Sequence, residues 1–330
     1  MRKAWMSGVL VLVCAAAAAG QSNPAPKPDA SAPQATQNPI RVQVNLVNVL
    51  FTVTDKKGRT RLDLNKDDFR VIEDGKPQSI SFFSRETDLP LRIGVLIDTS
   101  NSVSDRLHFE EEAAVDFLSE AIRPGKDLAF VVGFDVEPQL VQDYTDDVEK
   151  LSTAIRGLAA GGTTSFYDAL YYASQQKMAK PAGGASDAPS GPYLRRVLIV
   201  VSDGRDTSSG RSRDEALQMA EHSDAIIYAI GTNNNGTNTA GSNTPNSFGQ
   251  GDKILKYLAN ETGGKVFFPF EASDLASDFR EIAKELRSQY SLAYTPTNSK
   301  RDGAFRTIDV ETTEKGLRVR AKAGYFAPSK

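Results

Sequence analysis

The chain has 330 residues, with 39 basic and 42 acidic side chains and a formal net charge of −3. This length is sufficient for a large hydrophobic core and for more than one domain. The nearly balanced charge gives no electrostatic reason to expect binding to nucleic acid or to an anionic membrane surface.

Residues 1–20 have the pattern of a secretory signal peptide. Arg2 and Lys3 provide the positive start, and an apolar run over residues 8–19 ends in small residues suited to cleavage. That run is too short for a stable membrane span, and no later segment is long enough either. We therefore expect a mature chain without a transmembrane segment that is secreted, periplasmic or displayed at the cell surface.

The only cysteine, Cys14, lies inside this signal. A lipoprotein signal needs a small residue directly before its cysteine, and Val13 occupies that position, so lipidation is the less favoured alternative. A mature chain without cysteine forms neither disulfides nor thiolate metal sites. Export without disulfides suits a bacterial envelope protein better than a eukaryotic secreted one.

Two segments of different composition follow the signal. Residues 21–38 are rich in Pro, Ala, Ser and Gln and cannot bury enough apolar surface to fold, so we expect a disordered linker. Residues 39–90 contain an alternating apolar stretch and an Asp-Gly turn at 74–75 between two strand-like stretches. This pattern predicts a small β-rich segment.

Residues 91–288 alternate between apolar strands and amphipathic helices. Apolar runs predict strands at 91–97, 128–134, 140–144, 196–202, 225–230 and 265–268. Helical patterns predict helices at 103–122, 147–158, 167–178, 213–222, 253–261 and 275–288. Polar stretches at 181–192 and 232–250 indicate loops. The alternation predicts an α/β fold with a doubly wound, mostly parallel sheet covered by helices on both faces.

The predicted helix at 103–122 has an apolar stripe that should face the sheet. We expect the glutamate run at 110–112 to lie outside this stripe, on a solvated face. The two histidines, His108 and His222, also fall on predicted helices, and we expect both at the surface.

Residues 289–330 return to a β pattern. Three antiparallel strands are predicted at 289–294, 305–312 and 316–323. We expect this segment to pair with residues 39–90, so that the α/β part is an insertion in a small β-sandwich.

Side chains with oxygen atoms follow the predicted strands of the α/β part. Asp98, Ser100 and Ser102 alternate directly after its first strand, and Asp203 follows a later one. Between them in the chain, the glycine-rich loop 161–165 carries two threonines. A doubly wound sheet binds ligands beyond the carboxyl ends of its strands, and we expect all three segments to lie there. Carboxylate and hydroxyl oxygens suit a hard cation such as Mg²⁺ or Mn²⁺.

This order of motifs resembles the metal-ion-dependent adhesion site (MIDAS) of von Willebrand factor type A (VWFA) domains: Asp-x-Ser-x-Ser, a threonine in a glycine-rich loop, and an aspartate after a later strand. The resemblance covers about residues 90–288. It implies that five residues hold a Mg²⁺ or Mn²⁺ cofactor: Asp98, Ser100, Ser102, Thr164 and Asp203. Thr163 is the alternative to Thr164, and Asp206 and Asp135 are candidates for contact through water.

The resemblance also implies a function. Two carboxylates balance the charge of the cation and leave a position open, where an Asp or Glu carboxylate of a partner protein can bind. The chain is thus expected to be an exported, cation-dependent protein-binding or adhesion module without catalytic residues. In the flanking segments, Asp68-Phe69, residues 73–78 and Gly324-Tyr325-Phe326 resemble the secreted type A-related proteins common in Acidobacteria.

Other interpretations remain open at this stage. Ser102 with Asp105, and Ser165 with Asp168, also fit helix capping boxes, and the last aspartate of the motif fits a plain Asp-Gly turn. A second function is that of a structural protein of the cell envelope whose metal site only stabilises the fold. A third is a metal-dependent hydrolase, or a serine hydrolase that uses Ser100. The sequence has no His-Glu-x-x-His, Gly-x-Ser-x-Gly or phosphate-loop motif that would support a hydrolase.

Overall fold

The computed structural model describes residues 46–86, 89–179, 194–232, 249–269 and 272–329. The expected signal peptide and linker lie outside the described residues, as do almost all of the two expected loops at 181–192 and 232–250. None of the helices in the described ranges is long and apolar enough to span a lipid bilayer.

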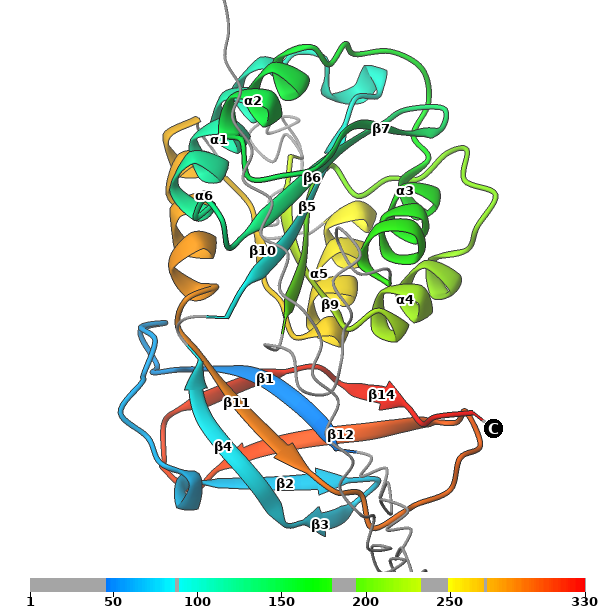
Figure 1. Ribbon diagram of the computed structural model, residues 1–330. Coiled ribbons are helices and arrows are strands. Elements are labelled where there is room, and N and C mark those ends of the chain that lie inside the picture. The colour runs from blue at the N-terminus through cyan, green and yellow to red at the C-terminus, as the bar shows by residue number, and fades with distance from the viewer. Residues whose placement is uncertain (1–45, 87–88, 180–193, 233–248, 270–271, 330) are drawn as a thin grey trace, which may run out of the picture. The chain divides into compact units, whose positions relative to one another are not determined.

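A six-stranded sheet forms the centre of the α/β part (Figure 1). Its strand order is β10-β9-β8-β5-β6-β7, and all neighbours are parallel except β7, which is an antiparallel edge strand. The strands are β5 (Leu91–Asp98), β6 (Leu128–Phe134), β7 (Pro138–Thr145), β8 (Arg195–Ser202), β9 (Ala225–Gly231) and β10 (Val266–Phe267). The continuous apolar runs are explained by burial on both faces of the sheet. The predicted doubly wound fold is confirmed.

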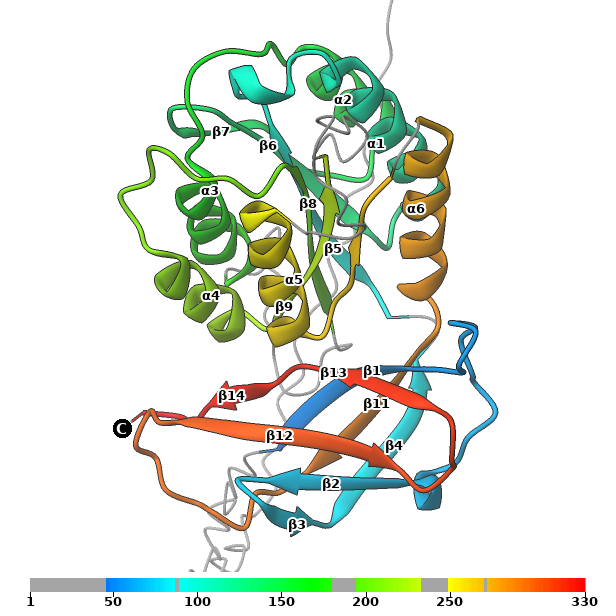
Figure 2. The same cartoon turned by 180° about the vertical axis from the view of Figure 1, so that it is seen from behind.

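Helices cover both faces of this sheet, as Figures 1 and 2 show. One face packs against α1 (Leu107–Ala121), α2 (Val148–Arg156) and α6 (Ala272–Glu285). The other face packs against α3 (Phe166–Tyr172), α4 (Arg213–His222) and α5 (Gln250–Thr262). A π-helical turn, Ala173–Met178, continues α3, and a 3-10 turn, Asn101–Val103, precedes α1. Alternate residues of the strands therefore enter two separate apolar layers.

The expectation of a solvated glutamate run on α1 is wrong for two of its three residues. Glu110 is 1% exposed and Glu111 is 7% exposed, whereas the Glu112 side chain is 45% exposed and pairs with Arg156. The reason is that α1 packs against α2 and α6 as well as against the sheet, so more of its circumference is covered than one stripe. Both histidines are exposed, as predicted.

Strands from both ends of the described chain form two antiparallel sheets. One has the order β13-β1-β11-β4 and the other the order β14-β12-β2-β3. The first contains β1 (Val47–Thr54), β4 (Ile80–Glu86), β11 (Gln289–Tyr294) and β13 (Arg318–Ala321). The second contains β2 (Phe69–Glu73), β3 (Lys76–Gln78), β12 (Phe305–Thr312) and β14 (Gly324–Phe326). Residues of both sheets share one hydrophobic core, in which Phe51, Phe69 and Tyr290 pack ring to ring. This is a small β-sandwich.

The C-terminal strands do not form the three-stranded antiparallel arrangement that their sequence suggests. β11 and β13 both pair with β1, whereas β12 pairs with β2 and β14 in the other sheet. Dividing these strands between two facing sheets allows their apolar sides to bury one another, which a flat three-stranded sheet cannot achieve.

Candidate metal site

The site begins at Asp98, the last residue of β5, whose surface is fully buried. Its Oδ1 accepts a hydrogen bond from the Ser100 backbone N–H at 3.0 Å, and its Oδ2 accepts one from the Ser202 hydroxyl at 2.7 Å. The hydroxyl oxygens of Ser100 and Ser102 lie 2.9 Å apart. The turn after β5 thus gathers the carboxylate and both hydroxyls of the Asp-x-Ser-x-Ser motif.

Asp203 lies directly after β8, the neighbour of β5 in the sheet, and its side chain is 8% exposed. Its Oδ1 accepts a hydrogen bond from the Arg205 backbone N–H at 2.9 Å, which forms a tight turn through Gly204. Gly204 has φ +72°, and a Cβ atom there would lie 2.5 Å from the carbonyl oxygen of Gly251. Only glycine fits this turn, which sets the direction of the Asp203 side chain.

The glycine-rich loop connects α2 to α3, between the two helices that the sequence predicts there. Long-range hydrogen bonds bring it to the same edge of the sheet. The Gly161 N–H donates to the Thr99 carbonyl at 2.7 Å, and the Asn101 N–H donates to the Gly162 carbonyl at 3.4 Å. The loop is therefore fastened to the turn that carries Asp98.

The two candidate threonines have different surroundings. Thr164 is 4% exposed, and its backbone binds the loop that follows Asp203: its N–H donates to the Thr207 hydroxyl at 2.9 Å and its carbonyl accepts from the Thr207 N–H, also at 2.9 Å. Thr163 is exposed, and its hydroxyl lies 2.9 Å from that of Ser208. Together with the Asp98–Ser202 bond, these contacts join all three loops in a closed ring.

The two capping-box interpretations are wrong. The hydroxyl of Ser102 bonds to that of Ser100, and the cap residue of α1 is Arg106, without a side-chain cap. Ser165 makes no side-chain cap for α3 either, and within the described part of the chain its buried hydroxyl has no hydrogen-bond partner. The serines of the Asp-x-Ser-x-Ser motif are therefore not occupied in helix capping.

The two outer candidates serve local structure. Asp206 Oδ1 accepts hydrogen bonds from the Tyr167 N–H, at 3.3 Å, and from the Ser209 hydroxyl, which ties its loop to the start of α3. Asp135 Oδ1 accepts the N–H of the next residue, Val136. Neither has a hydrogen bond to Asp98 or Asp203 in the described structure.

Burial makes the site electrostatically unusual. Burial raises the pKa of Asp98 to about 6, although hydrogen bonds from Ser202 and Ser100 oppose the shift, and the negative charge of Asp203 raises it further. Two carboxylates that repel each other in a buried place are stabilised by a cation between them. The donor set of Asp98, Asp203 and nearby hydroxyls is all oxygen and fits Mg²⁺ or Mn²⁺.

The hydroxyls are essential to this fit. Across the described ranges, no three His, Cys, Asp or Glu side chains come together as they would in a metal site built from those residues alone. Hydroxyl oxygens of this edge, or water, would have to complete the coordination of a cation held by Asp98 and Asp203.

One charged residue near the site was missed by sequence reasoning. Burial raises the pKa of Glu110 to about 8, and the negative charges of Asp98 and Asp203 add to the effect. The sequence did contain the signal: Glu110 is three residues after Leu107 and four before Ala114, so it falls on the apolar stripe of α1.

A sequence model of the von Willebrand factor type A domain matches residues 93–289. The chain belongs to this family. Type A domains are generally non-enzymatic interaction modules, and those with a MIDAS bind divalent metals. No curated protein sequence matches the chain.

Several solved structures are similar to this type A domain protein. A von Willebrand factor type A protein from Catenulispora acidiphila is 13% identical, with 82% of this chain and 76% of that chain covered and a TM-score of 0.46. The PilB minor pilin from Streptococcus sanguinis is 14% identical, with 60% and 61% covered and a TM-score of 0.43. Proximal thread matrix protein 1 from the mussel byssus, with a zinc-occupied MIDAS motif, is 14% identical, with 65% and 49% covered and a TM-score of 0.46. The chain spans less than two thirds of the pilin and of the byssus protein.

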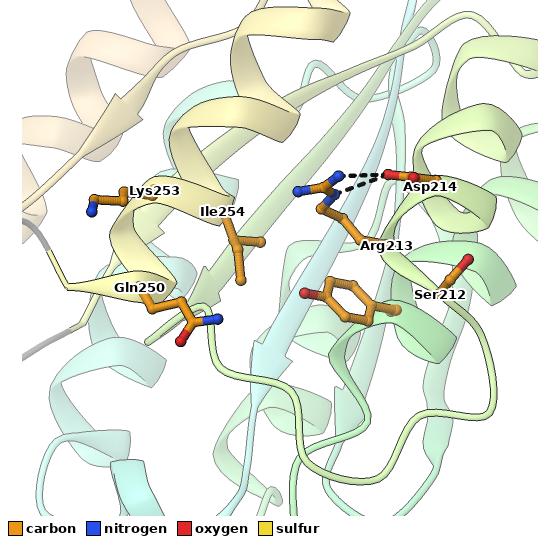
Figure 3. A pocket seen from close by; sticks show the side chains of 7 residues that line it. Ser212, Arg213, Asp214, Gln250, Lys253 and Ile254 are labelled. Carbon is orange, nitrogen blue, oxygen red and sulfur yellow. Dashed lines mark hydrogen bonds and ion pairs between the residues drawn. The ribbon is translucent and has the colours of Figure 1, made fainter.

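A separate cavity of about 400 Å³ lies at the start of α4 and α5 (Figure 3). It is lined by Tyr167, Ser212, Arg213, Asp214, Gln250, Lys253 and Ile254. Arg213 points toward Asp214 and pairs with it at 2.8 Å, so the most strongly basic group of the cavity already has a counter-charge. None of the candidate metal ligands lines this cavity.

Proposed function

We propose that this type A domain holds a Mg²⁺ or Mn²⁺ ion and uses it to bind an Asp or Glu side chain of a partner protein. The proposed ligands are Asp98, Ser100, Ser102, Thr164 and Asp203, with Thr163 as the alternative threonine. The observation that carries the proposal is the closed ring of hydrogen bonds among three loops, which gathers two buried carboxylates and several hydroxyls at one edge of the sheet.

The proposed ligands differ in their exposure to solvent, and we infer different roles for the buried and the exposed ones. Asp98 and Ser100 are buried, so they would bind the cation on its protein-facing side. Ser102 is exposed and lies on the side that a partner can reach. When bound, the cation supplies a position that can exchange water for a carboxylate oxygen. Asp98 and Asp203 balance its two charges, so a partner carboxylate does not have to overcome an excess of negative charge from these two ligands.

We further propose that the protein is bacterial and works outside the cytoplasm, either secreted, in the periplasm or at the cell surface. The signal-like start of the sequence and the absence of cysteine from the rest of it support this. The resemblance to secreted type A-related proteins of Acidobacteria is consistent with the same location.

A second candidate is a structural protein in which the cation only stabilises the fold. It is favoured by one observation: Asp98 already has hydrogen bonds at both carboxylate oxygens, so the loops are joined without help from a partner. The two functions differ in whether an acidic ligand binds.

The first test is calorimetric titration of the chain with MgCl₂ and MnCl₂. The wild type should bind, and Asp98→Ala should not. Ser102→Ala, at an exposed position, should weaken binding without unfolding, and Asp105→Ala, an exposed acidic control in the same turn, should bind like the wild type. A folded wild type that binds neither ion would refute the proposal.

The second test separates the two candidates. The chain is passed over surfaces coated with poly-glutamate or poly-glutamine, with Mg²⁺ or with a chelator. If the cation binds acidic side chains, the wild type should bind to poly-glutamate in the presence of Mg²⁺ but not to poly-glutamine and not with the chelator. The Asp98→Ala variant should bind to neither surface. Metal binding without any preference for poly-glutamate would favour the structural role.

A further inference from the structure

Glu110, in the first turn of α1, is a buried acid whose negative charge is only partly compensated by its surroundings. The residue is 1% exposed, and within the described ranges neither of its carboxylate oxygens has a hydrogen-bond partner. Buried carboxylates are normally paired or hydrogen-bonded, because burial without compensation strongly disfavours the charge. An acid left in this state indicates that a compensating charge belongs nearby.

A chain of hydrogen bonds connects Arg106, the cap residue of the helix that carries Glu110, to the candidate ligand Asp98. Arg106, one helical turn earlier, donates a hydrogen bond to the carbonyl of Thr232 at the end of β9. The Thr232 N–H donates to the Ser202 carbonyl at 3.0 Å, and the Ser202 hydroxyl donates to Asp98 at 2.7 Å. The face of α1 that carries Arg106 and Glu110 therefore lies against the carboxyl ends of the strands that hold the site.

The charges that face Glu110 do not balance. Asp98 and Asp203 act on it as negative groups, and Arg106 is the facing positive group, with the Thr232 hydroxyl as a polar neighbour. Arg205 also lies 3.8 Å from Asp203, so three carboxyl groups are set against two guanidinium groups and one negative charge remains uncompensated. A divalent cation held by Asp98 and Asp203 would supply the missing positive charge.

We propose that Glu110 is a charge-balancing residue of the metal site: it does not ligate the cation, but its buried negative charge raises the affinity of the Asp98–Asp203 site for a divalent cation. This inference rests on the proposed function, because it requires that these ligands hold a metal. Groups just outside a set of metal ligands commonly change metal affinity tenfold to a hundredfold when they are removed. Glu110 acts in this way through its charge and position.

The test is calorimetric titration with MgCl₂ alone at pH 8, with wild type, Glu110→Gln and Glu111→Gln. Glutamine keeps the size of the side chain and removes its charge. We expect Glu110→Gln to bind Mg²⁺ roughly tenfold to a hundredfold more weakly. Glu111→Gln is the matched control, because Glu111 is also buried on α1 but lies 3.8 Å from His108 and should leave the affinity unchanged.

A second measurement, thermal unfolding without metal, separates charge from structure. Glu110→Gln should be at least as stable as the wild type, since it removes an uncompensated buried acid. Equal Mg²⁺ affinity of Glu110→Gln and wild type would overturn the inference and leave the proposed function intact. A wild type that binds no cation would overturn both, and Mg²⁺ binding without capture on poly-glutamate would remove only the acid-binding function.

Discussion

Ser202 offers a sharp test of how the site is held together. Its hydroxyl is fully buried, donates to Asp98 Oδ2 at 2.7 Å and accepts from the Gly204 N–H at 3.0 Å. Ser202→Ala removes both bonds while barely changing the volume. It leaves one oxygen of a buried carboxylate and one backbone N–H without these partners.

The expected loss can be worked out from these two bonds. A hydrogen bond to a charged group contributes about 1.5–3 kcal/mol and a bond between neutral groups about 1 kcal/mol. We therefore expect Ser202→Ala to lower the free energy of unfolding by about 3 kcal/mol without metal. With saturating Mg²⁺ the loss should be smaller, because a cation would take over part of the compensation of the Asp98 charge.

The assay is urea unfolding with and without Mg²⁺, followed by circular dichroism. Ser223→Ala is the matched control: this serine is also buried, but its hydroxyl donates only to the Ala220 carbonyl, at 2.9 Å, at the end of α4. Its loss should be about 1 kcal/mol and independent of Mg²⁺. If Ser202→Ala cost no more than the control, or cost the same with and without Mg²⁺, the electrostatic reasoning for the site would be wrong.

Two further predictions concern the scaffold. Burial opposes ionisation of Asp127, but hydrogen bonds from Arg123, the Leu91 N–H and Arg287 outweigh it and lower its pKa to about 2. Asp127→Asn should therefore lose about 2–3 kcal/mol of stability at pH 7. That difference should persist above about pH 4 and vanish as the pH falls toward 2, which urea unfolding across this range would detect; a difference that does not depend on pH would contradict it. Gly204→Ala should lose about 1–3 kcal/mol, because of its positive φ and the nearby carbonyl, and should weaken Mg²⁺ binding; unchanged calorimetric affinity would contradict our account of the turn.

Local sequence determined the elements of the α/β part and most of the candidate site. The apolar runs before Asp98 and Asp203 predict buried parallel strands, and the carboxyl ends of neighbouring parallel strands lie at one edge. The oxygen-rich residues that follow could therefore be assigned to that edge without coordinates. These inferences succeed because they depend on the periodicity and the order of residues within short segments.

Features that depend on contacts between residues far apart in the sequence could be seen only in the tertiary structure. The loop with Thr164 follows a helix, and long-range hydrogen bonds to Thr99, Asn101 and Thr207 bring it to the site. The C-terminal strands divide between two sheets because β1 and β2 accept them as neighbours in each. Glu110 is buried on a helix that packs against α2 and α6 as well as against the sheet, and the local sequence does not show how many neighbours a helix will have.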